Sequence, residues 1–207
     1  MSEGAAKDLV CLVADKDLEQ AIGALLQRPE ALDIRPPIFD VFPHPEKDPG
    51  CCHHGVDFLR PFATRYRHAL LVFDFEGCGR EGKTSSELEQ DLETDLSRNG
   101  WDDRARVIVI EPELEVWVWS DSPEVDAILG WSGKLPGLRA WLEQEGWLEA
   151  GAAKPERPKE AMEAALREAR KPRSSATFRK LAETVSFQRC QDRKFLRLKQ
   201  VLQRWFD

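Results

Sequence analysis

Two carboxylates, Asp74 and Glu76, end an apolar run in the segment LLVFDFEG, residues 70–77. Alternate residues of a β-strand point to the same face, so the two acids are expected side by side at a strand end, before the chain turns at Gly77. Open α/β sheets place their ligand sites at the carboxyl ends of their strands. Because oxygen ligands suit hard divalent cations, the pair predicts a site for Mg²⁺ or Mn²⁺.

Other acids follow neighbouring apolar runs. Asp15 comes after the run at residues 8–14, and Glu113 comes after the run at residues 106–110, with Glu111 or Glu115 as further members. One or two metal ions held by such a cluster would support hydrolysis or transfer of a phosphodiester, with Asp15 as a ligand or proton-transfer group. The competing interpretation is that these acids cap helices or are solvated. The predicted catalytic set is Asp15, Asp74, Glu76 and Glu113, and the predicted metal ligands are Asp74, Glu76 and Asp15.

The elements that position these acids follow from hydrophobic periodicity. Apolar runs at residues 8–14, 38–42, 69–75 and 106–110 are strand-like, and they alternate with helical patterns that begin at residue 17 and that span residues 56–66 and 86–96. Ser85 or Ser86 is the expected cap of the third helix. This alternation predicts an α/β fold with a four-stranded, mainly parallel, Rossmann-like sheet covered by helices on both faces.

A second region follows the sheet. The stretch EAGAAKPERPK, residues 149–159, mixes Gly, Ala, Pro and charge as a linker does. It is expected to separate an α/β domain of residues 1–148 from a basic, helical C-terminal extension of residues 160–207. Helical patterns are predicted at residues 135–145, 158–170 and 175–183. The apolar side of the last helix is expected to carry Phe187, Cys190, Phe195, Leu198, Val201, Leu202 and Trp205.

Charge divides the 207-residue chain unevenly. Residues 151–207 hold 15 Lys and Arg against 7 Asp and Glu, a net charge of +8, so residues 1–150 hold the other 15 and 30, a net charge of −15. Such asymmetry fits an acidic metal-binding body beside a basic arm that contacts nucleic acid or an acidic partner. The alternative is that the two halves neutralise each other.

The quoted motifs resemble the small TOPRIM-like proteins, which share the metal-binding fold of topoisomerases, primases and overcoming-lysogenization-defect nucleases. The matching residues are Asp15 in LVADKD, Asp74 and Glu76 in VFDFEG, and Glu113 and Glu115 in EPELEVWVWSD. The C-terminal segment FQRCQDRKFLRLKQVLQRWF is similar to the tails of compact members from bacterial anti-phage islands, including a component of methylation-associated defence systems. The resemblance implies a TOPRIM-like sheet, a Mg²⁺-dependent nuclease activity and defence-system partners.

Two positions depart from the family pattern. Its catalysts usually carry a glutamate after the first strand and Asp-x-Asp after the third, whereas this chain has Asp15 and Asp-Phe-Glu. Asp15 is one methylene shorter, and catalytic positioning tolerates little displacement. Metal binding is therefore expected to survive better than catalysis.

A phosphate-binding motif overlaps the same loop. Residues 77–84, GCGREGKT, satisfy the P-loop pattern G-x-x-x-x-G-K-[ST] between a strand and a helix. Against this interpretation, Asp74 and Glu76 would repel a triphosphate. In the favoured interpretation, Gly77 and Gly79 let the backbone turn and Lys83 is a solvated lysine.

Two further segments carry candidate ligands. Residues 44–54, HPEKDPGCCHH, hold zinc-ligand types, but a surface loop beside the site is favoured, from which Asp48 or His53 could approach substrate. In the tail, arginines recur every fourth residue, as expected for a helix face that tracks phosphates, although a solvated face is the alternative. The predicted nucleic-acid contacts are Arg189, Arg193, Arg197, Lys171 and Arg173, with Lys180 as a possible extension.

Composition favours an intracellular protein. The polar start MSEGAAKD does not resemble a signal peptide, the apolar runs are strand-length, and five cysteines without CxxC spacing suit a reducing compartment. We therefore expect a cytoplasmic protein.

Three functions stay open: a metal-dependent nuclease or nucleic-acid-processing component of a defence system, a P-loop nucleotide-binding enzyme, and a non-catalytic scaffold for other defence proteins.

Overall fold

A computed structural model of the chain describes residues 6–80, 82–120, 122–187 and 190–207. Four parallel strands form the sheet in the order β2-β1-β3-β4. Their bounds are β1 Lys7–Val13, β2 Phe39–Pro43, β3 Tyr66–Asp74 and β4 Ala105–Ile110. The predicted α/β class and the Rossmann-like parallel sheet are confirmed.

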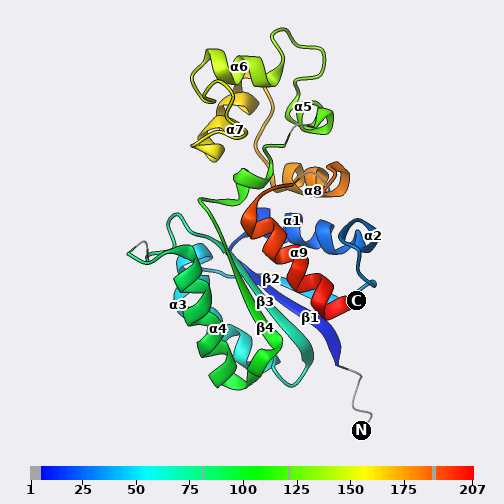
Figure 1. The fold of residues 1–207 in the computed structure, drawn as a ribbon, viewed down its shortest axis with the longest axis vertical. Helices are drawn as coiled ribbons and strands as arrows, with labels where there is room; N and C mark the ends of the chain where they lie inside the picture. The colour runs from blue at the N-terminus through cyan, green and yellow to red at the C-terminus, as the bar shows by residue number, and fades with distance from the viewer. Residues whose placement is uncertain (1–5, 81, 121, 188–189) are drawn as a thin grey trace.

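Continuous burial explains why the strands read as unbroken apolar runs. Every residue of β1 from Asp8 to Val13 is buried, and so is every residue of β3 from Ala69 to Phe73. Helices cover both faces, as they must for a sheet of this kind. Figure 1 shows α3 and α4 on one side of the sheet and α1, α2 and α9 on the other.

The helices around the sheet are α1 Lys16–Leu26, α2 Pro29–Leu32, α3 Lys47–Leu59, α4 Ser85–Leu96 and α9 Arg193–Phe206. The later part of the chain adds α5 Pro123–Leu129, α6 Leu138–Gln144, α7 Pro158–Glu168 and α8 Ser175–Thr184. Short turns of helix lie at η1 Arg60–Phe62, η2 Ser97–Trp101, η3 Asp102–Arg104 and η4 Leu114–Trp117. None of the helices in the described ranges is long and apolar enough to cross a membrane.

The chain after the expected linker packs back on the sheet domain. Residues 149–157 have no regular secondary structure, and α7 begins inside the expected linker at Pro158. Helix α8 then packs against α1, and α9 packs against β4. The buried side chains of α9 are Phe195, Leu198, Leu202 and Phe206. In Figure 1, α9 descends beside the sheet, whereas α5, α6 and α7 gather at the upper end of the molecule.

Helix α3 is the main departure from the expected elements. It spans Lys47–Leu59, whereas the prediction was a loop at residues 44–54 and a helix at residues 56–66. Pro49 lies in the first turn, where a missing N–H is tolerated, and the buried Cys51 and Cys52 anchor the helix to the core. Tyr66 instead begins β3. The cap of α4 also differs, because Thr84 forms a capping box with Glu87.

Gly50 and Gly23 provide a matched pair of helical glycines for testing this packing. A Cβ on Gly50 would overlap the buried His44 ring and lie 2.8 Å from Cβ of Glu46, whereas a Cβ on Gly23 of α1 would have no heavy atom within 4 Å. We expect Gly50→Ala to lower the free energy of unfolding by about 1–2 kcal/mol through overpacking. Gly23→Ala should raise it by about 0.5–1 kcal/mol through helix propensity. Urea denaturation measures both, and equal effects would contradict the described fit of His44 against α3.

Candidate metal centre

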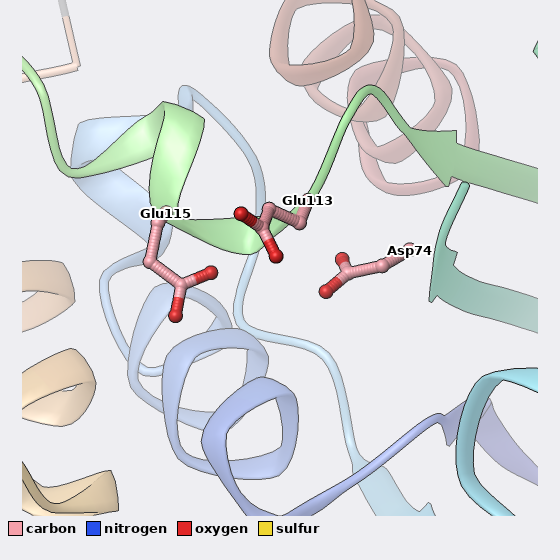
Figure 2. A group of neighbouring side chains, drawn as sticks. All are labelled: Asp74, Glu113 and Glu115. Carbon is pink, nitrogen blue, oxygen red and sulfur yellow. The ribbon is translucent and has the colours of Figure 1, made fainter. Parts of the chain in front are cut away.

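Three carboxylates meet beside the carboxyl ends of β3 and β4. Asp74, Glu113 and Glu115 each offer one oxygen, and these oxygens all lie within 4.8 Å of one another. This acidic triad is the one group of three or more potential metal ligands found in the described residues. Figure 2 shows the Glu113 carboxylate lying between those of Asp74 and Glu115, which both point toward it.

Backbone pairing beyond the strands brings the triad together. Hydrogen bonds between the two chain segments continue past the ends of β3 and β4. The N–H of Phe75, just after β3, donates to the Ile110 carbonyl at 2.8 Å, and the N–H of Glu76 donates to the Pro112 carbonyl at 3.0 Å. The segment that follows β4 therefore stays beside the end of β3. Glu113 is extended and immediately precedes η4, so that its side chain and that of Glu115 reach the end of β3.

Burial makes the triad electrostatically unusual. Glu113 and Glu115 are 4% and 2% exposed. Asp74 retains some exposure as a residue, but its Oδ1 is closed off from solvent and has no hydrogen-bond partner. Burial, followed by the charges of Asp48 and Glu115, raises the pKa of Asp74 well above its usual value. A buried carboxylate oxygen without a partner is rare and calls for a ligand or a proton.

Asp48 belongs to the same site, although the sequence predicts it only as a residue of a surface loop from which it could approach substrate. Its Oδ1 accepts a 2.8 Å hydrogen bond from the backbone N–H of Asp74. Burial raises the pKa of Asp48, and the charge of Asp15 adds to the rise. The sequence signal was the position of Asp48 just after β2, in the first turn of α3. Asp48 thus fixes the backbone at Asp74 and adds negative charge around the triad.

Asp15 lies near the centre and also caps α1. Its Oδ1 caps α1, accepting hydrogen bonds from the N–H groups of Asp17 at 2.9 Å and Leu18 at 3.0 Å. Its charge still acts on Asp48 and Asp74. The position after β1 agrees with the predicted convergence at the strand ends, and the role of Asp15 as a metal ligand or proton-transfer group stays a prediction.

Glu76 is placed differently from the expectation. Strand β3 ends at Asp74, and Glu76 lies in the following turn with an exposed side chain. The predicted side-by-side arrangement on one strand face is therefore wrong, because the two-residue alternation stops before Glu76. Burial and the charge of Glu115 raise the pKa of Glu113, Lys159 opposes the rise, and Glu76 remains close enough for its charge to add to it. Asp74 instead meets Glu113 and Glu115.

Two cations from the C-terminal region contact the triad glutamates. Lys159 of α7 donates to Glu113 twice, from its backbone N–H and from Nζ, each at 3.2 Å. Arg173 donates from Nη2 to Glu115 and pairs through Nη1 with Asp17, each at 2.8 Å. Burial lowers the pKa of Lys159 while the Glu113 carboxylate raises it, and the net shift is upward. The acidic body and the basic tail therefore meet at this site.

The other predicted nucleic-acid contacts are distributed differently. Arg197 pairs with Glu93 at 2.7 Å, and Lys171 donates to the Ile128 carbonyl at 2.9 Å. Arg193 is exposed at the start of α9. Arg189 lies outside the described residues. Much of the predicted stripe is thus engaged within the fold, and Arg193 is left facing solvent.

The overlapping P-loop motif forms a turn before α4. Gly77 and Gly79 adopt positive φ angles of 79° and 83°, which glycine tolerates and other residues rarely adopt. Lys83 forms an ion pair with Asp91, and the Thr84 hydroxyl is used in the cap of α4. The two side chains that would contact phosphate and metal in a P-loop are therefore both engaged along α4.

The His44–His54 segment does not gather its ligand types in the part of the chain that the structure describes. Cys51 and Cys52 point into the core, His54 pairs with Glu46 at 3.7 Å, and the Nδ1 atom of the buried His44 accepts the Glu46 N–H at 3.1 Å. These residues stabilise the start of α3, and its first turn brings Asp48 to the triad.

The triad fits a hard divalent cation. Mg²⁺ and Mn²⁺ are bound by carboxylate oxygens, with water and substrate oxygens completing the coordination. The buried, unpartnered Oδ1 of Asp74 is the observation that favours this fit, since a cation would satisfy it and offset the repulsion among the acids.

No family model, curated protein or solved structure matches this chain.

Proposed function

We propose that the protein is a metal-dependent, TOPRIM-like enzyme that cleaves or processes phosphodiesters in nucleic acid, acting in the cytoplasm as a component of a bacterial anti-phage defence system. The observation that carries this proposal is the buried triad of Asp74, Glu113 and Glu115, whose oxygens lie within 4.8 Å of one another beside the strand ends. The resemblance of LVADKD, VFDFEG and EPELEVW to that family supports the choice of chemistry.

The triad and the acids around it have separate roles in this proposal. Asp74, Glu113 and Glu115 would hold Mg²⁺ or Mn²⁺, and Asp48 keeps Asp74 in place through the backbone. A bound divalent cation would neutralise phosphate charge and lower the pKa of water that attacks phosphorus. Asp15 and Asp48 add negative charge nearby, which favours cation binding.

The position of the site in the sheet also supports this function. In the strand order β2-β1-β3-β4, the chain leaves β1 toward one edge and returns at β3 toward the other. Ligands of open α/β sheets bind at the carboxyl ends of strands at such a change of direction. Asp15 follows β1 and Asp74 ends β3, so both lie at this point.

Cleavage assays test this function directly. We expect the wild-type chain with Mg²⁺ or Mn²⁺ to cut DNA or RNA, and chelation to abolish cutting. Asp74→Asn should lower the rate at least about 100-fold, because a ligand that holds the metal is lost. The matched control is Glu76→Gln on the exposed turn, which should stay within a few-fold of wild type. Cutting that persists in Asp74→Asn, or that is unaffected by chelation, would refute the assignment.

A second candidate function is a non-catalytic scaffold subunit of a defence complex. The ion pairs of Lys159 with Glu113 and Arg173 with Glu115 favour it, because internal cations already offset the glutamate charges. In that case the triad is a structural ion-pair network, and metal should change neither nucleic-acid binding nor partner association. The P-loop alternative has less support, since Lys83 pairs with Asp91.

A further inference from the structure

Lys159 and Arg173 contact the triad in different ways. The Arg173 side chain is 35% exposed, and its two terminal nitrogens are both committed, to Asp17 and to Glu115. The Lys159 side chain is 47% exposed, whereas its partner Glu113 is only 6% exposed at the side chain. The ammonium group of Lys159 therefore lies at the solvent boundary of the site, with its carboxylate partner behind it.

The ammonium has donors to spare. An ammonium carries three N–H donors, and Glu113 Oε2 accepts one of them at 3.2 Å. The Lys159 backbone N–H separately anchors Glu113 through Oε1. The glutamate would thus remain held if the ammonium turned toward another anion. Arg173, with its guanidinium paired to two carboxylates, is better suited to holding the segment before α8 against α1 and η4.

The positive charge of Lys159 beside the triad weakens the binding of a metal ion that has no accompanying anion. Lys159 is a like charge beside a carboxylate that would hold the metal, and repulsion between the two cations weakens metal binding. An anion bridging the two cations removes that repulsion, because metal ions and lysines both contact phosphate oxygens. A half-exposed ammonium beside a buried acidic triad can therefore contact a phosphate that binds together with the metal ion or after it.

We propose that Lys159 is a phosphate-binding residue, which contacts the oxyanion of the substrate next to the metal-bearing triad. This inference rests on the proposed function and adds to it the residue that recognises phosphate. The recognised group is a phosphate oxyanion, and its source is either an internal phosphodiester of nucleic acid or a terminal phosphate.

The test is a pair of titrations on Lys159→Met. Calorimetry with Mn²⁺ alone should show binding up to about fivefold tighter than wild type, because a neighbouring positive charge is gone. Calorimetry with a cleavage-resistant, phosphorothioate-linked single-stranded oligothymidylate in saturating Mn²⁺ should show binding at least about tenfold weaker, because a charge-assisted hydrogen bond is lost. Lys159→Arg should restore most of the oligonucleotide affinity. A 5′-phosphorylated and an unphosphorylated oligomer distinguish a terminal phosphate from a phosphodiester.

The controls separate the possible failures. Arg157→Met removes an exposed cation that pairs with Glu160 next to the start of α7, and it should change neither affinity more than about twofold. Wild-type protein that fails to bind Mn²⁺ overturns the proposed function and this inference with it. Wild-type protein that binds Mn²⁺, with Lys159→Met leaving oligonucleotide affinity unchanged, overturns the inference alone. So does a parallel loss of both affinities, which is the signature of a purely structural lysine.

Discussion

Replacing Asp74 by asparagine is expected to weaken Mn²⁺ binding at least about tenfold while leaving the fold as stable as wild type or about 1 kcal/mol more stable. The metal loses a ligand oxygen that carries charge. The fold loses a charge that burial and the neighbouring acids disfavour, as the raised pKa of Asp74 indicates. Asparagine has nearly the shape of the neutral, protonated aspartate side chain. Calorimetry with Mn²⁺ and urea denaturation measure the two effects.

A charge elsewhere on the surface serves as the control for this variant. Asp95 on α4 is exposed and pairs with Arg98 at 3.5 Å. Asp95→Asn should alter neither Mn²⁺ affinity nor, beyond about 0.5 kcal/mol, the free energy of unfolding. If Asp74→Asn destabilised the protein and left Mn²⁺ affinity unchanged, Asp74 would be a structural residue and not a metal ligand.

The second large effect is expected at Arg173, where Arg173→Met should lower the free energy of unfolding by about 2–3 kcal/mol, because two buried carboxylates are left without their half-exposed cation. Removing one member of a buried ion pair leaves the other charge uncompensated. In Arg173→Met two carboxylates lose their cation. Both are buried, because Asp17 and Glu115 are 8% and 2% exposed. Methionine keeps much of the length and apolar stem of arginine, so the loss reports the charge. Urea denaturation at neutral pH measures it.

Arg179 on α8 provides the comparison for Arg173. It pairs with Glu183 at 2.7 Å one turn along the same helix, and both side chains are largely exposed. Arg179→Met should therefore cost no more than about 0.5 kcal/mol. Adding Glu115→Gln to Arg173→Met should restore part of the lost stability, because one buried charge is removed. Equal losses in Arg173→Met and Arg179→Met would contradict the described burial of the Arg173 pairs.

The sheet could be predicted because its signal is local. Strands buried on both faces need an unbroken apolar run, and β1, β3 and β4 each supply one. Helix α3 was missed at its start because Pro49 and Gly50 suggest a loop. Gly50 is required there because His44 occupies the space of a side chain. That contact is tertiary, and no local pattern of residues reveals it.

The site was predictable in part for the same reason. Parallel strands place their carboxyl ends at one edge, which is why Asp15, Asp74 and Glu113 were expected near one another. The carboxylates that lie beside Asp74 depend on where β3 ends. Because β3 ends at Asp74, Glu76 lies in the following turn, and the acids close to Asp74 are Glu113 and Glu115. Strand ends are set by tertiary packing and are the least certain feature of a sequence pattern.

The pairing of the tail with the body could not be derived from the sequence. Lys159 and Glu113 are 46 residues apart, and Arg173 and Glu115 are 58 residues apart. Opposite net charges in the two regions indicated attraction, either to each other or to external partners. The structure places Arg173 and Lys159 on acids of the triad, and Arg197 on Glu93. Charge counts alone do not distinguish these two outcomes.

The central claim is that Asp74, Glu113 and Glu115 together hold a divalent cation. Anomalous diffraction from crystals soaked in Mn²⁺ tests it most directly, because the signal locates the ion without assuming its ligands. We predict an anomalous peak within about 2.5 Å of a carboxylate oxygen from each of the three residues. Crystals in which Mn²⁺ occupies other sites while Lys159 and Arg173 remain closed on the two glutamates would contradict the account.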